Sequence, residues 1–194
     1  MAGSGYTLVL AAVAIMSAEA VSPPITVVPG RPKSVSLEKS ALFYLWNEQL
    51  DYQGALPAER DTQPIGTLLS PGFFHVVNLV PQDAPHPLYV NSYAELRAAL
   101  LRDHMLQDTV DPNDSRMKST NGLTAKTLTG KSVVFKKDNT DRITVNNIPV
   151  ENVETLSEGI VSYTLDGVLF DYVQQVDDAF HEYLRNSSSR DAQA

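Results

Sequence analysis

Few side chains in this chain are suited to carry out chemistry. There is no cysteine, which excludes thiol nucleophiles, disulfides and thiolate metal centres. The four histidines are at positions 75, 86, 104 and 181, and no two have the spacing of a metal-binding pair on a helix or hairpin. We therefore expect no bound metal ion and no other cofactor.

His104 is the histidine of greatest interest, because it follows Asp103 on the apolar face of a predicted helix. One interpretation is a core histidine that donates a hydrogen bond to a backbone carbonyl. The other is a polar patch beside an apolar pocket, in which His104 moves protons near neutral pH. Adjacent helix positions point about 100° apart, so Asp103 would not orient the His104 ring. We name both as candidate catalytic or binding residues and leave open whether the chain is an enzyme.

Composition limits the kinds of partner that the chain can have. Its 194 residues, 43% hydrophobic and 20% charged, fit one globular domain. Lys and Arg number 15 against 23 Asp and Glu, for a formal charge of −8. A phosphate backbone would repel such a chain, so we expect no nucleic-acid partner. We also expect no membrane span, since no segment is both long and apolar enough.

The first residues predict export from the cell. An apolar run over 6–16 is followed by Ala18-Glu19-Ala20, the small-residue pattern that signal peptidase cleaves. We therefore predict a signal peptide over 1–20, a proline-rich extended lead-in over 21–33 and a secreted protein. Sequons at Asn113 and Asn186 are predicted glycosylation sites on that route.

Hydrophobic periodicity predicts helices first and strands later. Helices are predicted over 34–49, 91–107 and 171–185, and a polar tail over 186–194. The second helix begins with a capping box of Ser92 and Glu95. Strands are predicted over 65–69, 132–136, 142–145, 149–153 and 160–165, while periodicity leaves the run 73–80 unassigned. This order is typical of an α+β domain. Large aromatic residues are assigned to the core: Tyr44, Trp46, Phe73 and Phe74.

Several short motifs occur in a fixed order along residues 34–170. They are Ile65-Gly66-Thr67-Leu68-Leu69-Ser70-Pro71, then Thr127-Leu128-Thr129-Gly130, then Ile143-Thr144-Val145-Asn146, and finally Asp166-Gly167-Val168-Leu169. The ordered set resembles a fasciclin-like domain. That resemblance implies an α+β fold in which a helical layer packs on a β-sandwich or wedge of mostly antiparallel strands. Fold alone does not specify an activity.

The resemblance also implies where binding residues lie. The family has a Tyr-His pair where this chain has Asp103 and His104. In animal members, a stretch before the last strand is associated with integrin-mediated adhesion. The matching stretch here is 152–156, with Glu154 in place of the family's Asp. Glu154 is therefore a third candidate binding residue.

Two functions follow from these observations. The first is a secreted binding or adhesion module whose partner is an extracellular protein or glycan. The alternative is a cofactor-independent enzyme of fungal secondary metabolism, of the cyclase or isomerase type. Its pocket would hold a small aromatic ligand and steer proton transfer and stereoselective cyclisation of an aromatic polyketide.

Overall fold

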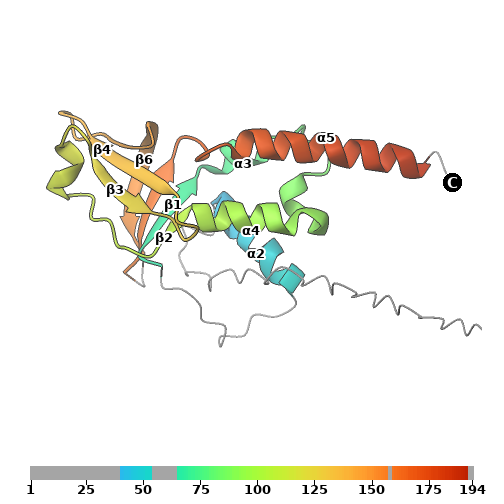
Figure 1. Ribbon diagram of the computed structural model, residues 1–194, viewed down its shortest axis with the longest axis horizontal. Helices are drawn as coiled ribbons and strands as arrows, with labels where there is room; N and C mark the ends of the chain where they lie inside the picture. The colour runs from blue at the N-terminus through green and yellow to red at the C-terminus, as the bar shows by residue number, and fades with distance from the viewer. Residues whose placement is uncertain (1–39, 54–64, 157–158, 192–194) are drawn as a thin grey trace, which may run out of the picture.

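The computed structural model describes residues 40–53, 65–156 and 159–191. Strands occupy one end of the molecule and the α-helices the other (Figure 1). The expected α+β class is confirmed. The predicted signal peptide and lead-in lie outside the described residues.

The strands form one seven-stranded sheet in the order β2-β1-β7-β6-β5-β4-β3. The pair β1 and β7 is parallel and the other neighbouring pairs are antiparallel. A bridge between Leu106 and Thr127 joins the end of β2 to the residue that follows β3, so the two outer strands meet. The bounds are β1 Thr67–Pro71, β2 Met105–Leu106, β3 Leu123–Lys126, β4 Ser132–Lys137, β5 Ile143–Val145, β6 Ile148–Thr155 and β7 Val161–Leu165.

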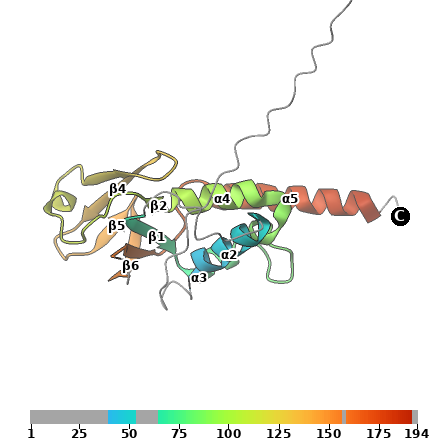
Figure 2. The same cartoon turned by 90° about the horizontal axis from the view of Figure 1, so that it is seen from below.

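The helices gather beyond one end of this sheet (Figures 1 and 2). Helix α2 packs against α4 and against the short helix α3 that follows β1. No helix in the described part of the chain has the length and apolar character to cross a bilayer. The α-helices are α2 Ala41–Gln53, α3 Phe73–Val77, α4 Ala94–Asp103 and α5 Tyr172–Asp191, and the 3₁₀ helices are Pro87–Tyr89, Asn91–Tyr93 and Ser115–Lys118.

Two apolar clusters fill the interior. The helical one contains Trp46 and Tyr172 and draws on α2, α4 and α5. The other lies within the sheet, where the rings of Phe135 and Tyr163 meet edge to face at 5.2 Å between centroids. Helix α5 is therefore a structural part of the domain, because its apolar face closes the helical cluster.

The predicted hairpin region is confirmed almost residue by residue. Strands β4 to β7 match the four predicted strands to within two residues at their ends. Asn146 and Asn147 form the turn between β5 and β6 with φ of 49° and 67°, the left-handed region that asparagine tolerates. Asp138 organises the preceding turn, because its carboxylate accepts hydrogen bonds from the backbone N–H groups of Thr140 and Arg142.

The helix predicted over 91–107 is wrong at both ends. Tyr93 is the N-terminal cap of α4 and no side chain accepts a capping hydrogen bond, so the capping box does not form. The helix ends at Asp103 because Met105 and Leu106 instead pair with β1. Backbone pairing at the sheet edge thus overrides the helical periodicity of these residues.

Two other predicted helices have different bounds in the structure, and the unassigned run is now defined. The helix predicted over 34–49 is described from Ala41 and extends to Gln53, while positions 34–39 lie outside the described residues. The Ser40 hydroxyl accepts a hydrogen bond from Phe43 N–H at 3.4 Å at its start. The unassigned run 73–80 begins with the short helix α3. The helix predicted over 171–185 extends to Asp191, through part of the predicted polar tail.

Gly66, immediately before β1, is required by close backbone packing. A Cβ at this position would lie 2.5 Å from backbone atoms of Gln107, Asp108 and Thr109. We predict that Gly66→Ala lowers the free energy of unfolding by about 3 kcal/mol or more, because backbone atoms cannot move aside.

Gly130→Ala is the control for this experiment. Gly130 has φ of +87° with open space around it, so the change adds only backbone strain of roughly 1–2 kcal/mol. Urea denaturation of both variants measures the difference. Equal losses would contradict the packing argument.

Candidate functional site

Asp103, the first candidate residue, is the last residue of α4 and is 1% exposed. Its Oδ2 accepts a hydrogen bond from the Tyr172 hydroxyl at 2.5 Å and lies 2.6 Å from Lys131 Nζ. Its Oδ1 accepts from the Thr129 hydroxyl and, more distantly at 3.4 Å, from the Thr127 hydroxyl. Both carboxylate oxygens are thus occupied by side chains of the turn after β3 and of α5.

These partners keep Asp103 ionised. Burial alone would raise the pKa of the carboxyl, but hydrogen bonds from Lys131, Thr129 and Tyr172 outweigh burial and lower it. The pKa of the Tyr172 phenol is raised, chiefly by burial and then by the hydrogen bond that it donates to Asp103. Lys131 Nζ also lies 4.7 Å from the centre of the Phe170 ring, a cation–π distance.

His104, the second candidate, is fully buried at the C-terminal cap of α4. Its Nδ1 lies 2.8 Å from the Leu100 carbonyl oxygen, and its Nε2 lies 3.2 Å from the Leu169 backbone nitrogen. Since a carbonyl only accepts and an N–H only donates, the ring is the neutral tautomer with hydrogen on Nδ1. Burial lowers its pKa to about 4, against a smaller opposing effect of the Leu100 hydrogen bond.

Asp103 and His104 therefore act as adjacent but separate anchors. Asp103 joins α4 to the turn at 127–131 and to α5, while His104 joins α4 to Leu169. The core interpretation of His104 describes this geometry. Each of its ring nitrogens has a backbone partner, which leaves no ring nitrogen available to a substrate in this conformation.

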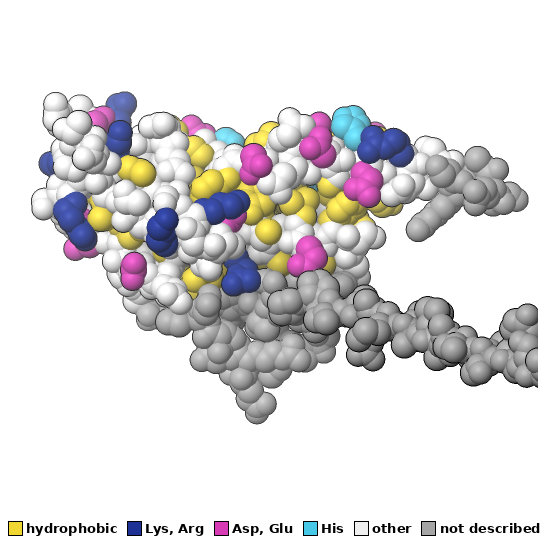
Figure 3. All heavy atoms as spheres, in the orientation of Figure 1, with side chains coloured by type: hydrophobic (Ala, Val, Ile, Leu, Met, Phe, Trp, Pro, Cys, Tyr) yellow, Lys and Arg dark blue, Asp and Glu magenta, His cyan; other side chains and the backbone are white. Residues whose placement is uncertain are grey.

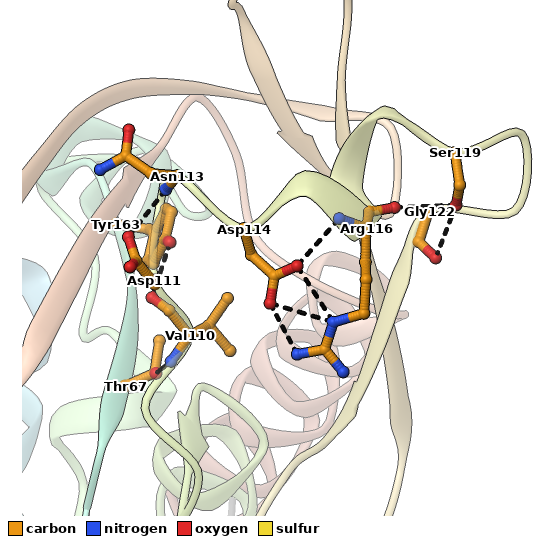
Figure 4. Close-up of polar contacts among 9 residues, drawn as sticks. All are labelled: Thr67, Val110, Asp111, Asn113, Asp114, Arg116, Ser119, Gly122 and Tyr163. Atoms are coloured by element: carbon orange, nitrogen blue, oxygen red, sulfur yellow. Dashed lines mark hydrogen bonds and ion pairs between the residues drawn. The ribbon is translucent and has the colours of Figure 1, made fainter.

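The other predicted residues lie on separate elements. Glu154 is partly exposed on β6, opposite Ser162 of β7. Asn186 is exposed on α5. Asn113 is exposed in the turn after Val110, and its backbone N–H donates to Asp111 at 2.8 Å while its side-chain amide points away (Figure 4).

The segment that carries Asn113 is fixed to the sheet. The Thr67 hydroxyl donates to Asp108 O at 2.7 Å. The same hydroxyl accepts from Val110 N–H at 2.8 Å, and the Tyr163 hydroxyl donates to Val110 O at 2.9 Å (Figure 4). Asp114 then holds the Arg116 guanidinium through both of its oxygens. The sequon is thus presented on an anchored, solvent-facing turn.

Two aromatic residues that we assigned to the core lie instead at the surface. Trp46 is fully buried as expected, but Tyr44 is 43% exposed and Phe74 is 70% exposed. Their rings belong to an edge-to-face series, with Tyr44 5.5 Å from Phe73 and Phe73 5.6 Å from Phe74. We call these three residues the aromatic ledge. Sequence periodicity missed it because α2 is apolar almost all round.

A second surface feature is a polar hollow of about 380 Å³ beside β4. It is lined mainly by amides and one cation: Thr120, Asn121, Val134, Lys136, Asn146 and Asn147. Asn146 has a structural role there, since its side-chain oxygen accepts from Val134 N–H at 2.8 Å. The hollow offers hydrogen-bonding groups to a polar ligand but contains no acid–base pair.

Comparison with known proteins gives a likeness of fold. No protein-family profile matches the chain, and no curated protein matches it. Among solved structures it matches one described as "Novel Fold Revealed by the Structure of a FAS1 Domain Pair from the Insect Cell Adhesion Molecule Fasciclin I", with 16% sequence identity and a TM-score of 0.47. The match covers 73% of this chain and 48% of that one, so the chain spans about half the length of the domain pair.

The buried His104 predicts a stability loss in mild acid. Its folded pKa of about 4 lies below the ordinary value of 6.5, so between these pH values the unfolded chain binds a proton that the native chain does not. The free energy of unfolding should therefore fall as the pH drops from 6.5 to 4, by on the order of 3 kcal/mol from this residue.

Urea denaturation across this pH range, on the wild type and on His104→Gln, measures the effect. His86 is also buried and its pKa is lowered by burial, so it adds to the pH dependence of the free energy of unfolding in both proteins. The difference between the wild type and His104→Gln in the slope of unfolding free energy against pH therefore gives the contribution of His104. Identical slopes would show that His104 is not held neutral in the native state.

Proposed function

We propose that the chain is a secreted, single fasciclin-like domain that acts as a binding or adhesion module for an extracellular protein or glycan. The observation that carries the proposal is the aromatic ledge. Large aromatic side chains in solvent are costly for a soluble protein and are enriched at the centres of binding interfaces. Phe74, 70% exposed on the short helix α3, is the most exposed large hydrophobic side chain among the described residues.

The ledge is suited to binding because its rings support one another. Phe73 contacts both Tyr44 and Phe74 in edge-to-face geometry, so the exposed rings are attached to a partly buried one. Rings held in this way lose little conformational entropy when a partner covers them. The hydroxyl of Tyr44 adds a polar group, and a flat ring also stacks on the apolar face of a sugar.

Charge restricts the partner further. The formal charge of −8 disfavours polyanionic ligands. On the face shown in Figure 3, basic and acidic side chains are interspersed. Hydrophobic side chains are exposed on the same face between the helices α4 and α5. A neutral or basic partner is therefore favoured.

The enzymatic alternative gains no support from the geometry. Proton transfer needs a group that reaches the substrate and titrates near the working pH. Asp103 is buried among four hydrogen-bonding partners, and both ring nitrogens of His104 bond to the backbone. The two candidate catalytic residues are thus engaged in contacts that hold the fold together, which favours a binding function carried by surface side chains.

Truncation of the ledge tests the binding function. We expect the wild-type protein to bind at least one member of a panel of purified matrix proteins and cell-wall polysaccharides in surface plasmon resonance. Phe74→Ala should weaken that binding about tenfold or more, as loss of a central aromatic anchor does. Glu154→Gln, measured in the same assay, tests whether the binding residue that the family resemblance indicates contributes to affinity.

Val173→Ala is the matched control, because Val173 is a 53% exposed apolar residue on a different helix, α5. Its binding should equal that of the wild type. Light scattering on the same samples gives the valency, since a single weak module gains adhesive strength only by repetition. Binding that is unaffected by Phe74→Ala would remove the ledge from the proposal, and no binding across the panel would contradict the adhesion function.

Secretion, the second part of the proposal, predicts glycosylation at two exposed asparagines. Expression of the full chain in a eukaryotic secretory host should yield a product in the medium that carries glycans on Asn113 and Asn186. Asn113→Gln and Asn186→Gln should each remove one glycan, as measured by intact mass before and after glycosidase treatment. Retention of the chain inside the cells would contradict this prediction.

A further inference from the structure

Three metal-ligating side chains from distant parts of the sequence meet at the surface beside β7. They are His75 of α3, Glu151 of β6 and Asp166, which directly follows β7. One ligand atom of each lies within 4.8 Å of the others, and His75 Nε2 is 2.9 Å from Asp166 Oδ1. All three are partly or largely exposed, so an ion can reach them from solvent.

The backbone holds these three residues in position. The Gly72 N–H donates to Leu165 O at 3.0 Å, which fixes the start of α3 against the end of β7. The Asp166 N–H donates to Pro149 O at 2.9 Å, which fixes Asp166 to β6. Glu151 is the extra residue of a register shift in β6 opposite β7, and bulges of this kind re-aim a side chain.

Gly72 leaves room for the imidazole. A Cβ on residue 72 would lie 3.0 Å from Cδ2 of His75, tighter than ordinary contact. The absence of a side chain at this position allows the His75 ring to lie over the start of its own helix, with Nε2 toward Asp166.

We propose that His75, Glu151 and Asp166 form a binding site for a divalent transition-metal ion of the zinc class. An imidazole nitrogen and two carboxylate oxygens are ordinary zinc ligands, at about 2.0–2.2 Å from the ion. Tetrahedral ligands at that radius lie roughly 3.3 Å apart. The 2.9 Å between His75 and Asp166 is close to this value. The Glu151 carboxylate lies within 4.8 Å of both and would move inward to complete the set.

Charge balance favours the ion over a simple His75–Asp166 pair. The cluster brings two carboxylates to one place, and a divalent ion offsets the charges of both. Three protein ligands leave at least one coordination position open for water or for a donor from another molecule. This proposal does not depend on the aromatic ledge or on the binding function proposed above.

Zinc titration of the purified full chain, followed by isothermal calorimetry, tests the site. We expect one ion per chain, and a loss of affinity of at least about tenfold in each of His75→Ala, Glu151→Gln and Asp166→Asn. Glu151→Gln is the decisive variant, because an ordinary ion pair between His75 and Asp166 does not need this carboxylate. It is an exposed side chain, so its replacement should leave the fold intact, as circular dichroism would verify.

His181→Ala provides a matched control. His181 Nε2 lies 3.6 Å from Asp177 Oδ1 on α5, an exposed histidine–aspartate pair that belongs to no three-ligand cluster in the described part of the chain. This variant should bind zinc like the wild type. The proposal is overturned if the wild type binds no zinc, if Glu151→Gln binds it with unchanged affinity, or if His181→Ala loses as much affinity as His75→Ala.

Discussion

The buried carboxylate of Asp103 is the contact on which the junction of helices and sheet depends. A charge at 1% exposure is tolerated only if hydrogen bonds and an opposite charge replace the water that it has lost. Thr129 and Lys131 supply them from the turn after β3, and Tyr172 supplies one from α5. That turn follows directly on the bridge between Leu106 and Thr127, where the two outer strands of the sheet meet. One carboxylate thus fixes a helix end, a sheet closure and a second helix relative to one another.

His104 extends the same junction by one residue, and the two together explain where function can reside. The neutral imidazole bridges Leu100 within α4 and Leu169 before α5, so its acid–base capacity is suppressed by the fold that it stabilises. Both ring nitrogens are used in contacts that hold the helix end against the segment before α5. The two surface features proposed above for binding, the aromatic ledge and the cluster of His75, Glu151 and Asp166, are built from partly or largely exposed side chains.

Local patterns predicted the parts of the fold that local forces determine. A hydrophobic pattern of period two, with turn residues between the runs, located β4 to β7, because a hairpin is specified by residues that are close in sequence. The segment 91–107 could not be predicted in this way, since Met105 and Leu106 leave the helix to pair with β1. The exposure of Phe74 depends on what α2 leaves uncovered, and an apolar run carries no signal of that. The meeting of His75, Glu151 and Asp166 requires the sheet topology, so no spacing in the sequence could have indicated it.

The parallel pairing of β1 with β7 has a kinetic consequence. Thr67 lies opposite Val161, and the intervening chain contributes every other strand of the sheet. During synthesis β1 emerges before the other strands and waits for a neighbour that is made after all of them, while β3 to β6 can form hairpins as they appear. The apolar strand Thr67–Pro71, buried along its whole length in the finished molecule, is meanwhile exposed to other chains. Maturation of this protein therefore depends on how well the early segment is shielded until the last strand arrives.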